Sequence, residues 1–349
     1  MSDEMNISEM MAHQVNRLFA DAVSRDSWVA SEQGQFDTEL WQSLVAMGIP
    51  LAMCSESTGG AEMSWRDMEQ TLRLCGRYAA PIPLGESVIA SGLLDRAGIA
   101  VPDGPMTFSA ERFELDAQGR VHGVDQQLSW SPAVRHVVLL AGTVEQPSLC
   151  LVSIDSELAT ATPTYDRMPA GALKLKGQPV TLARSVPWLK GADLRPYLAA
   201  LRAIQMAGAM EQVLDLCLEY AGTRIQFGKT LGKFQAIQQY VAELAEHTAA
   251  AQVAGLYAAR QIDADRAEYG AAIAKSLTGR AATRMTEIAH QIFGAIGVTD
   301  EHSLHYFTRR LWQWRAEGGS EHYWAEYLGR NTLAAEGATL WQRVTRPLD

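Results

Sequence analysis

The stretch from Leu194 onward constrains the fold most, because apolar residues recur there at helical spacing over long segments. The apolar positions of three such segments are Leu198, Leu201, Val213 and Leu216; Phe234, Ile237, Val241 and Leu244; and Ile273, Leu277, Met285 and Ile292. A fourth segment begins near Gly318 and runs to Leu328. Long amphipathic helices joined by short loops bury their apolar faces against one another, so this stretch predicts an antiparallel bundle.

Two segments of different texture precede the bundle. From about Asn6 to Gly98 the apolar pattern is helical, whereas from Pro105 to Leu189 short β-rich runs alternate with turn residues. We therefore predict a mainly α protein with a small β domain. Its domains are an N-terminal helical domain (1–104), a middle antiparallel β domain (105–192) and a C-terminal four-helix bundle (193–349).

Composition and charge limit the classes of partner. The 349 residues include 40 Asp and Glu against 30 Lys and Arg, a formal charge of −10, which argues against nucleic-acid binding. No apolar run reaches the roughly 18 residues of a membrane span. The first 19 residues do not resemble a secretory leader, and the four Cys are scattered. We expect a cytoplasmic protein with no membrane partner.

The first candidate site lies between two of the predicted helices. Arg224, Gln226, Phe227 and Gly228 are followed by the helix that opens at Gln235. A guanidinium beside exposed glycine backbone and a helix N-terminus suits a phosphate group. The alternative interpretation is a connecting loop with a solvated Arg and Lys.

A second candidate site ends the third helix. Gln291 is followed by Gly294 and Gly297, and glycines at that spacing let a ligand or another chain approach the backbone closely. His302 and His305 lie just beyond, but HxxH without an acidic ligand in register is poor evidence for zinc. We predict no metal and assign them as surface and packing residues.

The third candidate is Glu317, which precedes Gly318 and Gly319 at the start of a late helix, among Trp and Tyr residues. A partly desolvated carboxyl group has a raised pKa and suits a general base. The alternative is a Glu that only stabilises the N-terminus of the helix.

The order and spacing of these motifs resemble the acyl-CoA dehydrogenase family of flavoproteins over nearly the whole chain. Residues 56–65 also resemble a family stretch, with Glu62 in place of its third Gly. The short middle domain is similar to that of bacterial members that work as heteromers on bulky acyl groups such as steroid side chains. The stretch 318–321 departs from the Gly-Thr-Ser-Gln of many members.

The resemblance implies FAD as cofactor, lying between subunits. It would place the pyrophosphate at a loop of one chain and the adenosine side at a turn of another. The loop residues are Arg224, Gln226, Phe227, Gly228 and Gln235, and the turn residues are Gln291, Gly294 and Gly297.

The resemblance also implies an oxidoreductase of fatty-acid or steroid side-chain catabolism. Glu317 would remove the α-proton of an acyl-CoA thioester while the β-hydrogen leaves as hydride to flavin N5. Some members carry the base on the helix before the Arg loop, but residues 197–201 hold no carboxylate. The implied partners are an electron-transfer flavoprotein and further subunits in a homo- or hetero-oligomer, a dimer or tetramer.

Two other functions stay open at this point. The chain could be a non-catalytic or half-site partner subunit of a heteromeric acyl-CoA dehydrogenase, which the short middle domain favours. It could also be a helical scaffold without cofactor, which would require the three motifs to be coincidental.

Overall fold

A computed structural model describes residues 6–155, 157–180, 182–189 and 191–334. The chain divides into two compact units, Met1–Thr71 with Ala80–Leu198, and Leu72–Ala79 with Ala199–Asp349. The predicted N-terminal helical segment and the predicted β segment both contribute to the first unit. The three-domain division remains a prediction, and the ends of its outer ranges, 1–5 and 335–349, lie outside the described residues.

The first unit opens with helices, as predicted. They are α1 (Ile7–Ala22), α2 (Arg25–Glu32), α3 (Thr38–Ala46), α4 (Trp65–Arg77), which continues into the second unit, and α5 (Leu84–Arg96). A capping box starts α1, where Asn6 Oδ1 accepts the Glu9 N–H at 2.9 Å and Glu9 Oε2 accepts the Asn6 N–H. Ser87 on the buried α5 bonds both backbone groups of Met106, which fixes this helix to the first strand.

One seven-stranded sheet follows, in the spatial order β5-β6-β2-β1-β3-β4-β7. The strands are β1 (Met106–Leu115), β2 (Arg120–Ser129), β3 (His136–Gly142), β4 (Pro147–Ser153), β5 (Ala159–Ala161), β6 (Ala170–Pro179) and β7 (Leu182–Ser185). Every neighbouring pair is antiparallel except β1 and β3, which run parallel. The predicted antiparallel domain is thus a mixed sheet. Because β2 occupies one edge of β1, the apolar β3 pairs with the other edge and is buried along nearly its whole length.

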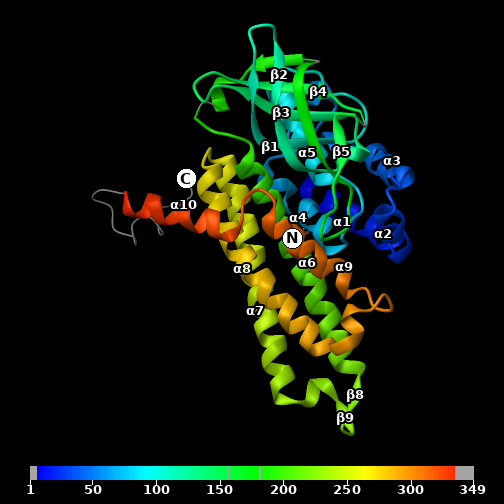
Figure 1. The fold of residues 1–349 in the computed structure, drawn as a ribbon. Helices are drawn as coiled ribbons and strands as arrows, with labels where there is room; N and C mark the ends of the chain where they lie inside the picture. Colours follow the sequence, from blue (N-terminus) through cyan, green and yellow to red (C-terminus); the bar gives the residue numbers. More distant parts are fainter. Residues whose placement is uncertain (1–5, 156, 181, 190, 335–349) are drawn as a thin grey trace. The chain divides into compact units, whose positions relative to one another are not determined.

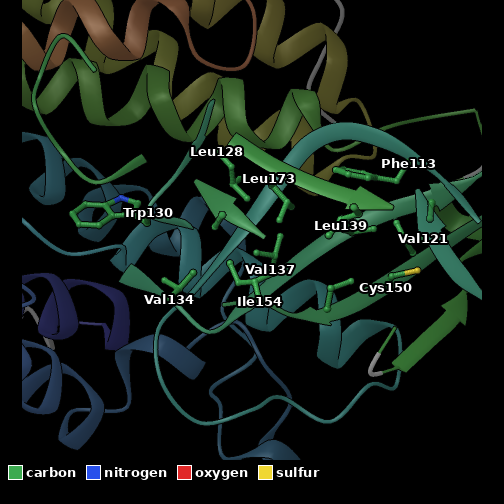
Figure 2. Packing of buried hydrophobic residues seen from close by; sticks show 14 of the residues in the cluster. Phe113, Val121, Leu128, Trp130, Val134, Val137, Leu139, Cys150, Ile154 and Leu173 are labelled. Carbon is green, nitrogen blue, oxygen red and sulfur yellow. The ribbon is translucent and has the colours of Figure 1, made fainter. Parts of the chain in front are cut away.

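The sheet carries its own apolar core, shown in Figure 2. Val137, Leu139 and Leu173 are completely buried at its centre, and Phe113 packs beside them. A Cβ atom on Gly123 would lie 2.6 Å from the ring of Phe113, so glycine makes room for that ring. The core orders the β segment without contributing any of the candidate site residues.

Over the described residues, the second unit contains the four helices predicted from apolar spacing and a fifth helix between the last two of them, so the predicted four-helix count was one too few. They are α6 (Arg195–Thr223), α7 (Gln235–Asp263), α8 (Ala267–Phe293), α9 (Leu304–Ala316) and α10 (Glu321–Leu333), of which the first residues of α6 belong to the first unit. A small hairpin of β8 (Ile225–Gln226) and β9 (Lys229–Thr230) joins α6 to α7 at one end of the bundle (Figure 1). No helix in the described part of the chain is long and apolar enough to cross a membrane.

Two glycines let α4 and α6 pack backbone against backbone. A Cβ atom on Gly76 would lie 1.8 Å from the Gln205 carbonyl oxygen, and one on Gly208 would lie 2.0 Å from that of Arg73. Arg73 also pairs with Glu211 at 2.8 Å. This close contact fixes the face of α6 on which Arg202 and Gln205 lie.

Candidate functional site

Glu317 stands at the break between α9 and α10. It is the C-cap residue of α9, with extended backbone (φ −71°, ψ 142°), and its N–H donates to the Gln313 carbonyl. Gly318 (φ 67°) and Gly319 (φ 97°) then turn the chain in the left-handed region, where only glycine is unstrained. Ser320 caps α10 by accepting the N–H of Tyr323. The local sequence therefore places one carboxylate at a sharp corner.

The carboxylate of Glu317 faces a buried cation. Its Oε2 lies 2.5 Å from Arg202 Nε, and its Oε1 accepts a hydrogen bond from Gln313 Nε2 at 2.7 Å. The side chains of Arg202 and Glu317 are 2% and 9% exposed. We expected Trp and Tyr around this group, and Trp314 does lie 6.0 Å from the Arg202 guanidinium. The ion pair, however, dominates the local electrostatics.

Lys275 fixes the backbone on both sides of Glu317. It is fully buried on α8, and its Nζ donates to the carbonyls of Arg315 (2.7 Å) and Gly319 (3.0 Å). Burial lowers the pKa of Lys275 to about 7, opposed by the charges of Glu317 and Glu321.

Glu321 belongs to a second ion pair at the same corner. Both of its carboxylate oxygens lie 3.0 Å from Arg315 Nε, and this pairing holds the pKa of Glu321 below its usual range. A Cβ atom on Gly279 of α8 would lie 2.7 Å from the Glu321 Cβ, so α8 and α10 approach closely here.

The loop that begins at Arg224 is exposed. Arg224 follows the last residue of α6, and its N–H donates to the Tyr220 carbonyl at 2.9 Å. Phe227 (φ 51°) and Gly228 (φ 79°) form the left-handed tip of the hairpin, and Phe227 is 90% exposed. Gln226 and Gln235 are exposed as well. No side chain caps the N-terminus of α7, so its first amides are available to an anion.

The turn after α8 lies at the same end of the second unit. Phe293 closes α8 and stacks on Tyr220 of α6, with ring centroids 4.3 Å apart. A Cβ atom added to Gly294 (φ 62°) would meet no heavy atom within 4 Å, so the backbone there is open, as is the exposed Gln291. Gly297 is buried, and a Cβ there would lie 2.9 Å from that of Phe293. One chain therefore presents both predicted cofactor motifs at the same end, whereas the resemblance implies that one FAD meets the loop of one chain and the turn of another.

The two His residues beyond this turn contact the backbone. His302 Nδ1 accepts the Leu304 N–H at 3.1 Å, and His305 Nδ1 lies 2.9 Å from the His302 carbonyl oxygen. Burial lowers the pKa of His302. Within the described residues, no cluster of His, Cys, Asp or Glu has the arrangement of a metal site.

The corner that carries Glu317 lies far from the two cofactor motifs of the same chain. Arg202 contacts Glu317, and Arg224 follows some 22 residues later, about 33 Å along α6. On α8, Lys275 lies beside Gly319 and Gly294 follows about 28 Å further on. Figure 1 shows the β8–β9 hairpin and α10 at opposite ends of the second unit.

Sequence reasoning missed Arg202, Lys275 and Gln313. The prediction for a base on α6 considered only carboxylates in residues 197–201, a range that ends one residue short of Arg202. A usable signal was present, because Arg202 and Lys275 each stand among apolar or small residues on a predicted buried face. Charged residues in such positions are almost never buried without a partner.

Comparison with known proteins finds similarity to acyl-CoA dehydrogenases. Residues 198–333 match the family model described as "Acyl-CoA dehydrogenase, C-terminal domain". Acyl-CoA dehydrogenase FadE27 of Mycobacterium tuberculosis is 28% identical over 309 residues, covering 78% of this chain and 82% of the relative. Acyl-CoA dehydrogenase IpdE2 of Mycolicibacterium smegmatis is 25% identical over 283 residues, covering 80% and 83%.

Solved structures confirm the predicted fold class. The ChsE4–ChsE5 complex from Mycobacterium tuberculosis matches with a TM-score of 0.82 and 21% identity, over 97% of this chain and 99% of that one. Butyryl-CoA dehydrogenase from Megasphaera elsdenii matches with a TM-score of 0.78 and 18% identity, over 95% and 100%. At these identities the likeness shows the fold, which extends over nearly the whole chain.

Proposed function

Because the chain belongs to the acyl-CoA dehydrogenase family, we propose that it is an FAD-dependent enzyme that introduces an α,β double bond into an acyl-CoA thioester. Glu317 is the base that removes the α-proton. The observation that carries this proposal is the placement of a shielded carboxylate, 9% exposed, at the glycine corner between α9 and α10. Bound FAD would supply the acceptor for the β-hydrogen, which leaves as a hydride with both electrons.

The residues at the other end of the second unit fit the phosphates of FAD. Arg224 supplies an exposed guanidinium, the tip at Phe227 and Gly228 turns backbone amides outward, and α7 begins without a side-chain cap. The open backbone at Gly294 suits the adenosine side. This donor set supports assigning the pyrophosphate and adenosine contacts to these two motifs.

The separation of the two ends supports an oligomeric site. The ribityl chain between the flavin ring and the diphosphate is short and does not bridge about 33 Å. One FAD therefore needs the Arg224 end of one chain and the Glu317 corner of another. The second chain is a copy of this one or a related subunit, and the exposed Phe227 at the hairpin tip offers it an apolar anchor. An electron-transferring flavoprotein is the proposed oxidant of the reduced enzyme.

Proton removal competes with the contacts that Glu317 already makes. In its described position the carboxylate accepts one hydrogen bond at each oxygen, from Arg202 and from Gln313, and each oxygen keeps a second lone pair. Low exposure excludes water, which strengthens any hydrogen bond to the thioester oxygen.

The same ion pair favours a second candidate function. Removing one partner from a buried pair costs about 3–5 kcal/mol, so the Arg202–Glu317 pair resists opening. If it stays closed, this chain is a half-site subunit whose partner carries the base. The ChsE4–ChsE5 complex is a precedent for an assembly of two different chains with this fold.

Flavin absorbance separates the two candidates. We expect the purified protein, alone or with a homologous subunit, to be yellow and to bleach with an acyl-CoA under anaerobic conditions. Glu317→Gln should retain the flavin and abolish bleaching, whereas Glu326→Gln, in an exposed ion pair on α10, should bleach normally. Bleaching that survives Glu317→Gln in a mixed complex would assign the base to the other subunit.

A further inference from the structure

We propose that Lys275 is a positioning residue for the proton transfer, because its buried amine holds the chain on both sides of Glu317 and so fixes where the carboxylate stands. This inference rests on the proposed dehydrogenase function. It adds to that function a residue that acts through Glu317 and not on the substrate itself.

The hydrogen bonds of Lys275 span Glu317. Its Nζ donates at 2.7 Å to the carbonyl of Arg315, two residues before Glu317. It also donates at 3.0 Å to the carbonyl of Gly319, two residues after Glu317. One amine on α8 therefore closes the corner between α9 and α10 into a ring, with Glu317 at its middle.

The corner needs such a contact because two glycines follow Glu317. Gly318 (φ 67°) and Gly319 (φ 97°) turn the chain through the left-handed region, and glycine is the residue with the most backbone freedom to lose on folding. Trp324 Nε1 holds the Gly318 carbonyl at 2.9 Å from within α10, whereas Lys275 ties the turn to the end of α9. Without Lys275 the two glycines regain conformations that move the carboxylate.

The burial of Lys275 has a cost that a purely structural contact does not require. The residue is 0% exposed, and both of its hydrogen bonds end on neutral carbonyl oxygens. Burying an ammonium in such surroundings is costly, and an uncharged amide side chain also has two N–H donors for two carbonyls. The charge of Lys275 thus has an effect of its own, which it exerts through space on Glu317 and Glu321.

Loss of the proton from Lys275 separates the effect of its charge from that of its hydrogen bonds. The charged groups that face the amine are those of Glu317, Glu321, Arg202 and Arg315. Burial lowers the pKa of Lys275 to about 7. The neutral amine keeps two N–H donors, one for each carbonyl, so the corner stays in place. The cation that stabilises the carboxylate of Glu317 is lost, however, and we expect the rate of proton removal to rise with pH around 7.

The test measures anaerobic bleaching of the flavin-loaded protein, in its complex with a partner subunit if one is required. Butyryl-CoA, octanoyl-CoA and a CoA thioester of a steroid side-chain acid are compared, and the fastest of them is used to determine kcat and KM. Lys275→Met, which loses both donors, should lower kcat about 100-fold with KM nearly unchanged, because a displacement of about 1 Å costs that much rate. FAD affinity should be retained, since Gly294 lies about 28 Å along α8 from Lys275.

A second variant separates position from charge. Lys275→Gln keeps two N–H donors on a neutral side chain and should recover at least about tenfold of the kcat lost in Lys275→Met. Neither variant should show the rise in rate around pH 7 that we expect of the unaltered protein. Arg280→Met, at an exposed position on the same helix, is the matched control and should keep both kcat and the pH profile.

The outcomes for this inference and for the proposed function can be told apart. Bleaching by Lys275→Met at the rate of the unaltered protein would overturn the role of Lys275 and leave the dehydrogenase function standing. If Lys275→Met does not fold, the pH profiles of Lys275→Gln and the unaltered protein are compared, and identical profiles would overturn it.

Hydrogen exchange decides the role of Lys275 at the corner even if no thioester bleaches the unaltered protein, a result that would reject the proposed function. The backbone amides of residues 317–320 should exchange at least about tenfold faster in Lys275→Met than in Arg280→Met, because the corner opens more often without the amine. Equal exchange in the two variants would show that Lys275 does not hold the corner.

Discussion

Tyr220 at the end of α6 stacks on Phe293 at the end of α8, with ring centroids 4.3 Å apart and planes 21° from parallel. Arg224 lies four residues, about one helical turn, after Tyr220, and Gly294 follows Phe293 directly. The stack therefore ties the loop proposed for the pyrophosphate to the turn proposed for the adenosine.

Replacing Tyr220 with Ala should weaken FAD binding about tenfold, because an aromatic pair contributes roughly 0.5–1.5 kcal/mol beyond the area it buries. Tyr220→Phe keeps the ring and should bind FAD as the unaltered protein does. Quenching of flavin fluorescence during titration of the apoprotein gives both dissociation constants. Unchanged affinity in Tyr220→Ala would show that the two motifs act independently of the stack.

The long helices could be predicted because helical spacing of apolar residues is a local signal. The bounds of α6 and α8 enclose the residues that the sequence placed on their buried faces. The parallel pairing of β1 with β3 could not be predicted in the same way, because it joins segments separated by a hairpin, and nothing in either strand encodes its neighbour.

The candidate site was predictable only in part, for a related reason. Motif spacing identified Glu317, but its partner Arg202 lies 115 positions away along the chain. When a predicted buried face is assumed to be apolar, an Arg or Lys on that face is not considered as a site residue. Such a buried charge nevertheless needs a specific partner. The distance between the Glu317 corner and the Arg224 loop follows from α6, because its residue Arg202 contacts Glu317 and Arg224 comes directly after its last residue.

The lowered pKa of Lys275 predicts how the free energy of unfolding depends on pH. It faces Glu317, Glu321 on α10, Arg202 on α6 and Arg315 on α9, and burial lowers its pKa from 10.5 to about 7. Between these two values the unfolded chain binds the proton that the folded chain does not, so Lys275 makes the free energy of unfolding rise with pH. Its contribution is present above pH 10.5 and is lost as the pH falls through 7.

Urea unfolding at pH 7 and pH 9 measures this effect. For the unaltered protein we expect Lys275 to add about 2 kcal/mol to the free energy of unfolding between these values. Lys275→Met should lose that increment, whereas Lys176→Met, at an exposed position on β6, should retain it. The same pH dependence in Lys275→Met as in the unaltered protein would mean that Lys275 is charged throughout this range.

Gly319 should not tolerate a side chain. Its φ is +97°, and a Cβ atom would lie 2.8 Å from Tyr323 Cδ1 and 2.9 Å from Trp324 Nε1. Gly319→Ala should therefore lower the free energy of unfolding by about 2 kcal/mol and displace the corner that carries Glu317. Gly329→Ala, inside α10 with nothing within 4 Å, should instead raise it by about 0.5–1 kcal/mol. Chemical denaturation distinguishes the two signs, and equal effects would contradict this expectation.

Replacing Glu62 with Gly should stabilise the protein. Glu62 has φ +53°, at the position that the sequence resemblance pairs with a Gly, and a non-glycine residue in that region costs roughly 1–2 kcal/mol. Glu62→Gly should raise the free energy of unfolding by about 1 kcal/mol, because relief of strain exceeds the added entropy of the unfolded chain. Glu56→Gly, six residues earlier and without positive φ, removes no strain and should lower it. Destabilisation by both substitutions would indicate that contacts of the Glu62 side chain outweigh its backbone strain.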